Sequence, residues 1–430
     1  MIVEFSVKNF RSIFDLQTIS FASTSLKSSK DNEEVDKNNI TSEDEMKLLK
    51  TIGIYGANAS GKSNIINALQ YFCQAISDLP SPESRLSKLT QPFLYQNSTE
   101  NSESFFQIVL IIKGKKYRYG FTVKANTDAN NNTEASKEII VKEWLFGPKN
   151  TNQVKYFLRN NLQVDKSNLP SSETIAALEY EHTLFLTHAA SYNKDICAEI
   201  RNAIRGFITS KFTLRSDFYR FHSIRQIEDD ELKSRFLVFL NAFGLNYKDI
   251  YFNKDEESNK KNYYPLDKLF FTKESCINNS LQVTLNMKEN ESEGTKKLFD
   301  LAGLIIHAFN IQTSALIILD EIDSNFHPQL LIKLVSLFND PKVNKSNTQL
   351  LFTSHDTNLL NSSIMRRDQF YFAEKENNEG TRLFSLAELK GIRNDADFAK
   401  QYLAGFYGGE PILSEFLSDN NLKNDGTLGN

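Results

Sequence analysis

The sequence predicts an α/β fold, in which buried strands alternate with amphipathic helices. Three short apolar runs, at residues 48–55, 315–319 and 350–354, have the length and composition of buried strands. Apolar residues recur at helical spacing directly after the first run, from Ser63 onward, and again over residues 296–306 before the second run. This alternation of strands and helices assigns the chain to the α/β class.

The turn between the first strand and its helix fits the phosphate-loop pattern G-x-x-x-x-G-K-[ST]. Strand, glycine loop and helix is the order in which this pattern has a mechanism. The glycines let backbone N–H groups point into one concavity, the helix N-terminus adds partial positive charge, and a lysine reaches the outer phosphates. The sequence therefore predicts a nucleoside triphosphate site with a magnesium ligand at its last residue, formed by Gly56, Ala57, Asn58, Ala59, Ser60, Gly61, Lys62 and Ser63.

Two carboxylates follow the second strand. Asp320 and Glu321 come directly after the fully apolar run 315–319, which is a Walker B pattern. A carboxylate at the end of a buried strand can accept a hydrogen bond from magnesium-bound water, and a second one beside it can orient the attacking water. We therefore predict that Asp320 serves the metal together with Ser63, and that Glu321 is a catalytic residue.

Two further segments become candidate parts of the site because of their order along the chain relative to the two motifs above. Ser292, Gly294 and Thr295 lie where the helix at 296–306 begins, and His355 follows the third strand. Taken singly, Ser292 reads as an ordinary helix N-cap and His355 as an ordinary polar residue at a strand end. A histidine in that place can also reach a γ-phosphate, which makes His355 a second catalytic candidate.

The order of these motifs resembles the ABC-type ATPase head shared by transporters, SMC proteins and the RecF group. The resemblance implies a P-loop NTPase fold, a parallel core sheet plus a smaller antiparallel sheet, and the cofactors ATP and Mg²⁺. It also implies that two heads sandwich two nucleotides, with Ser292, Gly294 and Thr295 completing the site of the other subunit in trans. Asp323 would belong to the D-loop along the dimer seam, and Gln91 is the candidate for the Q-loop.

Several short sequence segments narrow the resemblance to stand-alone bacterial ATPases of the abortive-infection or AAA type. That resemblance implies an ATP-hydrolysing enzyme of anti-phage defence, of the Rlo/AbiL and PARIS types, with a small Toprim-fold nuclease encoded nearby and a phage protein as trigger. It adds Arg11 and Asn64 to the nucleotide-binding residues. Phe406 stands where the family's usual ending has an arginine. The matching phrases lie at 8–12, 117–121, 143–145, 291–295, 366–370 and 402–408.

Composition places the protein among soluble, cytoplasmic chains. The 50 basic and 54 acidic residues give a net charge of −4, which does not indicate a globally basic nucleic-acid binder. DNA binding through a local basic patch stays open. The three cysteines are odd in number and widely separated, as expected for reduced thiols. No uninterrupted apolar stretch approaches the roughly 20 residues of a membrane helix, so we expect no membrane contact.

Polar stretches divide the chain into segments. Residues 105–112 and 117–123 read as strands joined at Lys113-Gly114, and residues 22–45 read as a polar loop. A stripe of apolar residues at helical spacing, Ile196, Ile200, Ile204 and Ile208, marks a helical insertion. We expect four parts: a first half of the head at 1–149, a helical insertion at 150–264, a second half of the head at 265–415, and a polar tail at 416–430.

Three other functions compete with this prediction. A RecF-like repair ATPase would bind duplex DNA through its ATP-closed dimer, with a steep salt dependence. Asp395 and Asp397 have the D-x-D spacing of a Toprim nuclease, but polar residues precede them, so a role at a helix N-terminus explains them better. Arg215 and His222 fit a ribonuclease pattern loosely, and the match is weak.

Overall fold

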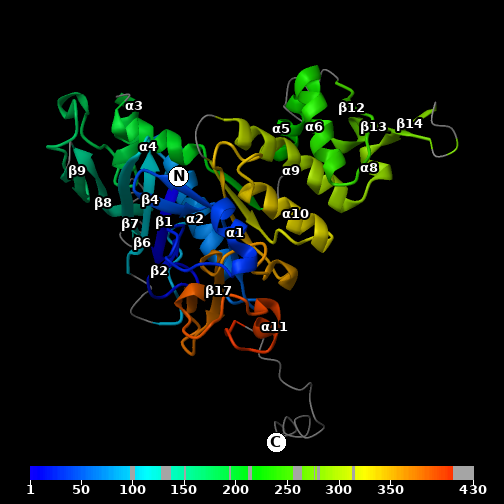
Figure 1. Cartoon of the computed structure of the whole chain (residues 1–430). Helices are drawn as coiled ribbons and strands as arrows, with labels where there is room; N and C mark the ends of the chain where they lie inside the picture. The colour runs from blue at the N-terminus through cyan, green and yellow to red at the C-terminus, as the bar shows by residue number, and fades with distance from the viewer. Residues whose placement is uncertain are drawn as a thin grey trace, which may run out of the picture.

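A six-stranded sheet lies at the centre of the molecule (Figure 1). The computed structural model describes residues 1–96, 102–126, 137–149, 152–192, 195–211, 216–254, 264–275, 277, 281–311 and 315–409. All neighbouring strands of this sheet run parallel except the last pair. The predicted α/β fold with a parallel core sheet is confirmed. In spatial order the strands are β11 (Ile208–Lys211), β15 (Leu316–Asp320), β16 (Gln349–Thr353), β5 (Thr51–Tyr55), β17 (Phe370–Lys375) and β18 (Thr381–Ser385).

Both faces of the core sheet are covered, which explains the unbroken apolar runs of its strands. In β15, Leu316 and Ile318 pack into one hydrophobic cluster with α2 (Lys62–Ser77). The alternate residues Ile317 and Leu319 pack into a second cluster, on the opposite face. That second face is covered by α9 (Glu293–Asn310) and α10 (Pro328–Asn339). Burial on both faces fixes where each strand ends, and so fixes the polar residues that follow.

The predicted antiparallel sheet lies beside α2 and has seven strands, one more than the core sheet (Figure 1). Its central hairpin turns through Lys113 and Gly114, both with positive φ (51° and 73°), so the loop has two residues and is shorter than the sequence indicated. In spatial order its strands are β10 (Gln163–Asp165), β9 (Asn152–Asn160), β8 (Glu138–Lys149), β7 (Lys115–Ala125), β6 (Ser104–Ile112), β1 (Ile2–Lys8) and β2 (Gln17–Ser20).

A buried charged residue organises this sheet. The Glu143 carboxylate accepts hydrogen bonds from the Phe185 and Leu186 backbone N–H groups at 2.6 and 2.8 Å and from the Tyr119 hydroxyl at 3.0 Å. It also lies 3.3 Å from the fully buried guanidinium of Arg159. Because Tyr119 and Glu143 both belong to phrases that carried the family resemblance, those phrases have a structural role here.

The segment predicted as a helical insertion, 150–264, is helical only in part. Besides its helices it contains β9 and β10 of the antiparallel sheet, β11 of the core sheet and β12 (Asp249–Phe252) of a third sheet. The apolar stripe was interpreted correctly up to Ile204, but Ile208 begins a strand. The division of the chain into domains stays a prediction. The helices are α3 (Phe185–Tyr192) and α4 (Ile196–Arg205), near α2, and α5 (Ser216–Glu228) and α6 (Asp230–Ala242), near α9.

The prediction of a polar loop at 22–45 holds for residues 23–29 and is wrong for residues 30–43. This stretch forms α1 (Glu33–Asn39) and β3 (Ile40–Glu43), and β3 pairs with β4 (Met46–Leu49). Its polar side chains form hydrogen bonds with buried residues far along the chain, and such contacts cannot be predicted from the local sequence. Asn39 Nδ2, for example, donates to Gln369 Oε1 at 2.7 Å.

A third, small sheet lies at the outer end of the lobe formed by α5, α6 and α9 (Figure 1). It consists of β12 (Asp249–Phe252), β13 (Leu269–Glu274) and β14 (Gln282–Asn286), followed by α8 (Met287–Asn290). Helix α11 (Phe398–Leu403) packs near β17 (Figure 1). Within the described ranges no helix has the length and apolar character that crossing a membrane requires. The predicted tail at 416–430 lies outside the described residues.

Candidate functional site

The predicted phosphate loop connects β5 to α2 and is shaped by glycine. Gly56 and Gly61 have φ values of 146° and 101°, in the region that favours glycine. A Cβ atom on Gly56 would lie 2.2 Å from the Ala373 carbonyl oxygen, and one on Gly61 would lie 1.9 Å from Thr381 Oγ1. Both glycines are therefore required by backbone conformation and by close packing against the β17–β18 pair.

Two buried polar side chains indicate that this loop binds an anionic ligand. The Lys62 ammonium donates to the carbonyl oxygens of Gly56 and Ala57, each at 2.8 Å. Burial lowers the pKa of Lys62 to about 8, although Asp320 and Glu321 oppose the shift. Ser60 Oγ is buried and has no hydrogen-bond partner among the described residues. A lysine and a free hydroxyl in one concave loop are suited to phosphate oxygens.

The predicted magnesium ligands lie side by side. Ser63 Oγ donates to Asp320 Oδ1 at 3.2 Å, although 257 residues separate them in sequence. Thr353 at the end of β16 also donates to Asp320 Oδ1, at 2.6 Å. Protein-bound Mg²⁺ takes few protein oxygens and fills its octahedron with phosphate oxygens and water, so a serine hydroxyl beside one carboxylate fits this ion.

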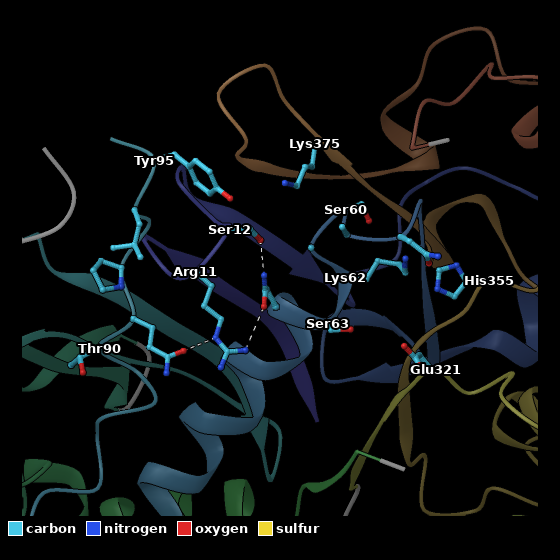
Figure 2. A pocket seen from close by; sticks show the side chains of 17 residues that line it. Arg11, Ser12, Ser60, Lys62, Ser63, Thr90, Tyr95, Glu321, His355 and Lys375 are labelled. Carbon is cyan, nitrogen blue, oxygen red and sulfur yellow. Dashed lines mark hydrogen bonds between the residues drawn. The ribbon is translucent and has the colours of Figure 1, made fainter. Parts of the chain in front are cut away.

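Glu321 is held in a strained backbone conformation. Its φ is 51°, which is uncommon for a residue with a side chain and costs about 1–3 kcal/mol. The Glu321 N–H donates to Thr353 Oγ1 at 2.7 Å, so one threonine positions both Asp320 and Glu321. The Glu321 side chain faces the phosphate loop near Ser63 (Figure 2). Retained strain at this point favours a functional role.

His355 lies next to Lys62, on the opposite side of the phosphate loop from Arg11 (Figure 2). Partial burial and the charge of Lys62 lower the pKa of His355 below its usual value, so the imidazole is largely neutral at pH 7. Its backbone N–H donates to Asp323 Oδ1 at 3.2 Å. The predicted D-loop carboxylate therefore anchors the backbone of His355 within the same chain.

These residues line one cavity of about 790 Å³. The Arg11 guanidinium extends from the loop after β1 into this cavity, and donates to Gln91 Oε1 at 2.6 Å and to Asn64 Oδ1 at 3.4 Å (Figure 2). Tyr95 and Lys375 stand at the far rim (Figure 2). Of the predicted nucleotide-binding and catalytic residues, the cavity is lined by Arg11, Asn58, Ala59, Ser60, Gly61, Lys62, Ser63, Asn64, Glu321 and His355.

A hydrogen-bonded brace fixes the phosphate loop from outside. Ser12 Oγ and Thr381 Oγ1 lie 2.7 Å apart, and Thr381 Oγ1 donates to the Ser60 carbonyl oxygen at 3.0 Å. Asn64 Nδ2 donates to Ser12 Oγ at 2.7 Å. The N-terminal loop and β18 therefore hold the phosphate loop together, through Ser12 on Asn64 and Thr381 on Ser60.

The predicted signature residues lie away from this cavity. Ser292 is exposed and caps α9, with its Oγ accepting from the Thr295 N–H at 3.2 Å, so the plain reading of Ser292 as an N-cap is also correct. Gly294 lies so close to the chain after Walker B that a Cβ would be 2.3 Å from the Asn325 carbonyl oxygen. Within one chain these residues do not touch the cavity, so a role in trans stays a prediction.

Two alternative sites find no support in the geometry. Asp397 caps α11 by accepting from the Lys400 N–H at 2.9 Å, and Asp395 pairs with Arg393 at 2.8 Å. Their interpretation as acids at a helix N-terminus is confirmed for Asp397. Arg215 lies outside the described residues, and His222 packs against His307 in α9 with ring centroids 5.0 Å apart.

Sequence reading missed several residues that build the site. Thr353 could have been found from the strand register, because Leu319 pairs with Phe352 and the next residues along both strands are Asp320 and Thr353. Gln91 was identified only as a Q-loop candidate. In the structure it lines the cavity, and its Oε1 accepts a hydrogen bond from Arg11. Thr381 carries no local motif, so only the fold reveals it.

Comparison with known proteins gives one family match. The family described as "AAA domain, putative AbiEii toxin, Type IV TA system" matches residues 52–361, which include the phosphate loop, both carboxylates and His355. Among curated proteins no match was found. A solved structure titled "Structure of the recombination mediator protein RecF-ATPrS in RecFOR pathway" is similar at 14% identity and a TM-score of 0.30, covering 89% of this chain and 98% of that chain. A TM-score this low supports no statement about function.

Proposed function

This chain belongs to the family of AAA domains described as "putative AbiEii toxin, Type IV TA system", and we propose that it binds ATP with Mg²⁺ and hydrolyses it between two copies of itself. Membership in this AAA family supports an ATPase, and the order of the motifs along the chain supports the ABC type. The proposal rests on the contacts between the two Walker motifs. Ser63 donates a hydrogen bond to Asp320, and Thr353 is hydrogen-bonded to both Asp320 and Glu321. Ser63, Glu321 and Lys62 line the same cavity.

In this proposal each residue has a role in hydrolysis. The glycine loop, Ser60 and Lys62 bind the phosphates, and Ser63 with Asp320 would hold Mg²⁺, which neutralises charge developing on the phosphate oxygens. Glu321 accepts a hydrogen bond from the attacking water and orients it, while His355 donates one to the outer phosphate. Arg11 and Asn64 bind the nucleotide at the other end of the cavity (Figure 2).

The second copy supplies the signature residues. Ser292, Gly294 and the start of α9 present backbone N–H groups and the positive end of an 18-residue helix. Ser292 is exposed and Gly294 is half-buried, so this end of the helix can face the phosphates of a partner's nucleotide. A twofold dimer would then contain two sites, each built from the phosphate loop of one copy and the signature of the other.

Complementation in trans tests this proposal. We expect Ser292→Asp to abolish ATP hydrolysis without destabilising α9, because aspartate is also a good N-cap but places a negative charge against phosphate. Lys62→Ala is expected to be inactive as well. A mixture of the two variants contains heterodimers with one intact site, so random reassociation should restore about a quarter of the wild-type rate. The measurement is phosphate release by each variant and by the mixture.

Ser292→Asn is the matched control, since it keeps the N-cap and adds no charge. It should retain more activity than Ser292→Asp at equal thermal stability. A mixture that stays as inactive as its components, although the two variants exchange subunits, would rule out the sandwich.

Nucleotide affinity should depend on pH above about 8. In the free protein burial lowers the pKa of Lys62 to about 8, and triphosphate charge favours the protonated form and raises that pKa again. ATP binding above pH 8 therefore takes up a proton, and the dissociation constant should rise with pH by up to about tenfold per unit. Below pH 8 the ammonium is already charged and this dependence should vanish. Calorimetry in buffers of different ionisation enthalpy measures the uptake.

We further propose that the ATPase acts in the cytoplasm in defence against phage and controls a partner nuclease. The matching phrases at 8–12, 291–295 and 402–408 support this through their resemblance to anti-phage ATPases, and the family's description refers to toxin–antitoxin systems. Co-purification of the chain with the product of a neighbouring nuclease gene tests it. Tight duplex DNA binding by the chain alone, with a steep salt dependence, would instead favour a RecF-like repair role.

A further inference from the structure

Lys297 lies in the second turn of α9, buried beneath the turn that follows Walker B. Its side chain is only 8% exposed. The ammonium donates to the Ser324 carbonyl oxygen at 2.8 Å and to Ser324 Oγ at 2.9 Å. The carbonyl oxygens of Ile322 and Glu321 lie 3.3 and 3.4 Å away. One cation therefore gathers oxygen atoms from a single short turn that begins with the predicted catalytic residue.

A second contact joins the same two segments. Gly294, one helical turn before Lys297, packs directly against the Asn325 carbonyl oxygen. The Phe326 ring lies 4.9 Å from the Lys297 ammonium, on the other end of the turn. The start of α9 and residues 321–326 therefore pack as one unit, which includes both Ser292 and Glu321.

The buried ammonium is suited to holding a strained backbone. Moving a lysine out of water is unfavourable, and burial lowers the pKa of Lys297 to about 8. Its contacts with carbonyl oxygens offset this penalty only while the turn keeps its present shape. Glu321, with φ of 51°, is the strained residue of that turn.

We propose that Lys297 is a positioning residue for ATP hydrolysis: it holds Glu321 in place and ties it to the signature end of α9. This inference rests on the proposed function. Among the described contacts, Lys297 does not line the nucleotide cavity and its hydrogen bonds go to the turn that begins with Glu321, so it acts through Glu321. Because Ser292 caps the start of α9, a partner's nucleotide bound at that end is linked through Lys297 to the catalytic residue of the same chain.

Lys297→Met tests the proposal, because methionine keeps the apolar stem and removes the donors. We expect kcat to fall by about 10- to 100-fold, since a misplacement near 1 Å at a catalytic group can reduce a rate about 10²-fold. The affinity for ATP should change by less than about twofold, because Lys297 does not line the cavity. Lys297→Arg should restore part of the rate. Lys345→Met is the control, since Lys345 is exposed and precedes β16, at the opposite end of the core sheet from the phosphate loop, and this variant should hydrolyse ATP normally.

A double variant separates positioning from general destabilisation. In the Glu321→Gln background, Lys297→Met should lower the single-turnover rate no further, because the residue it positions is already disabled. Amide exchange over 321–326 should accelerate in Lys297→Met and not in Lys345→Met. An unchanged kcat for Lys297→Met, or a further loss in the Glu321→Gln background, would overturn the proposal. A wild-type protein that binds ATP without hydrolysing it would instead overturn the proposed function itself.

Discussion

Glu321→Gln is expected to bind ATP with near wild-type affinity and to hydrolyse it about 10²–10⁴ times more slowly, the usual contribution of a positioned general base. Glutamine has the size of glutamate and can keep the backbone hydrogen bond from Glu321 N–H to Thr353, so the fold of the turn should survive. What is lost is the carboxylate that orients water. Phosphate release under saturating ATP, together with a binding isotherm, measures both quantities.

Because hydrolysis is blocked and binding is not, Glu321→Gln should also accumulate as an ATP-bound dimer in size-exclusion chromatography. Glu289→Gln, the same change at an exposed residue of α8, is the control and should behave as wild type. If Glu321→Gln turned over ATP at the normal rate, Glu321 would have no catalytic role and another residue would have to orient the water.

Lys62→Ala should have the largest effect on binding. Hydrogen bonds to charged groups contribute about 1.5–3 kcal/mol each, so losing two phosphate contacts corresponds to about 3–6 kcal/mol, or roughly 10²–10⁴ in affinity. The free protein should remain stable, because removing a partly desolvated ammonium also removes its burial penalty. Titration with a fluorescent ATP analogue measures the loss.

Lys345→Ala is the matched control for Lys62→Ala. Lys345 is exposed and precedes β16, at the opposite end of the core sheet from the phosphate loop. Its removal should leave affinity unchanged. Equal loss of affinity in both variants would mean that diffuse positive charge, and not the phosphate loop, binds the nucleotide.

The parts of the site that local sequence encodes were predictable. The phosphate loop, Asp320 and Glu321 each follow a buried strand directly, and parallel strands bring such residues to one edge of the sheet. The order of strands and helices also follows from apolar periodicity. Hence the α/β class and the centre of the candidate site could be derived from the sequence alone.

The remaining parts depend on contacts distant in sequence. β11 joins the core sheet beside β15, although it lies inside a stretch that reads as helical. Thr381 reaches the phosphate loop, and Lys297 reaches the turn after Glu321, through packing that no periodicity encodes. Asn39 and its buried partner Gln369 explain why a polar stretch is ordered. In each case a tertiary partner, absent from the local pattern, determines the structure.

The position of β5 has a consequence for biosynthesis. Both neighbours of β5 in the core sheet, β16 and β17, belong to the last third of the chain, and the brace between Ser12 and Thr381 spans 369 residues. A nascent chain that has emerged only to the middle can complete its antiparallel sheet, whose strands end at Asp165, but cannot close the phosphate loop. Translation must therefore proceed past Thr381 before the nucleotide site exists, and prematurely terminated products cannot sequester ATP.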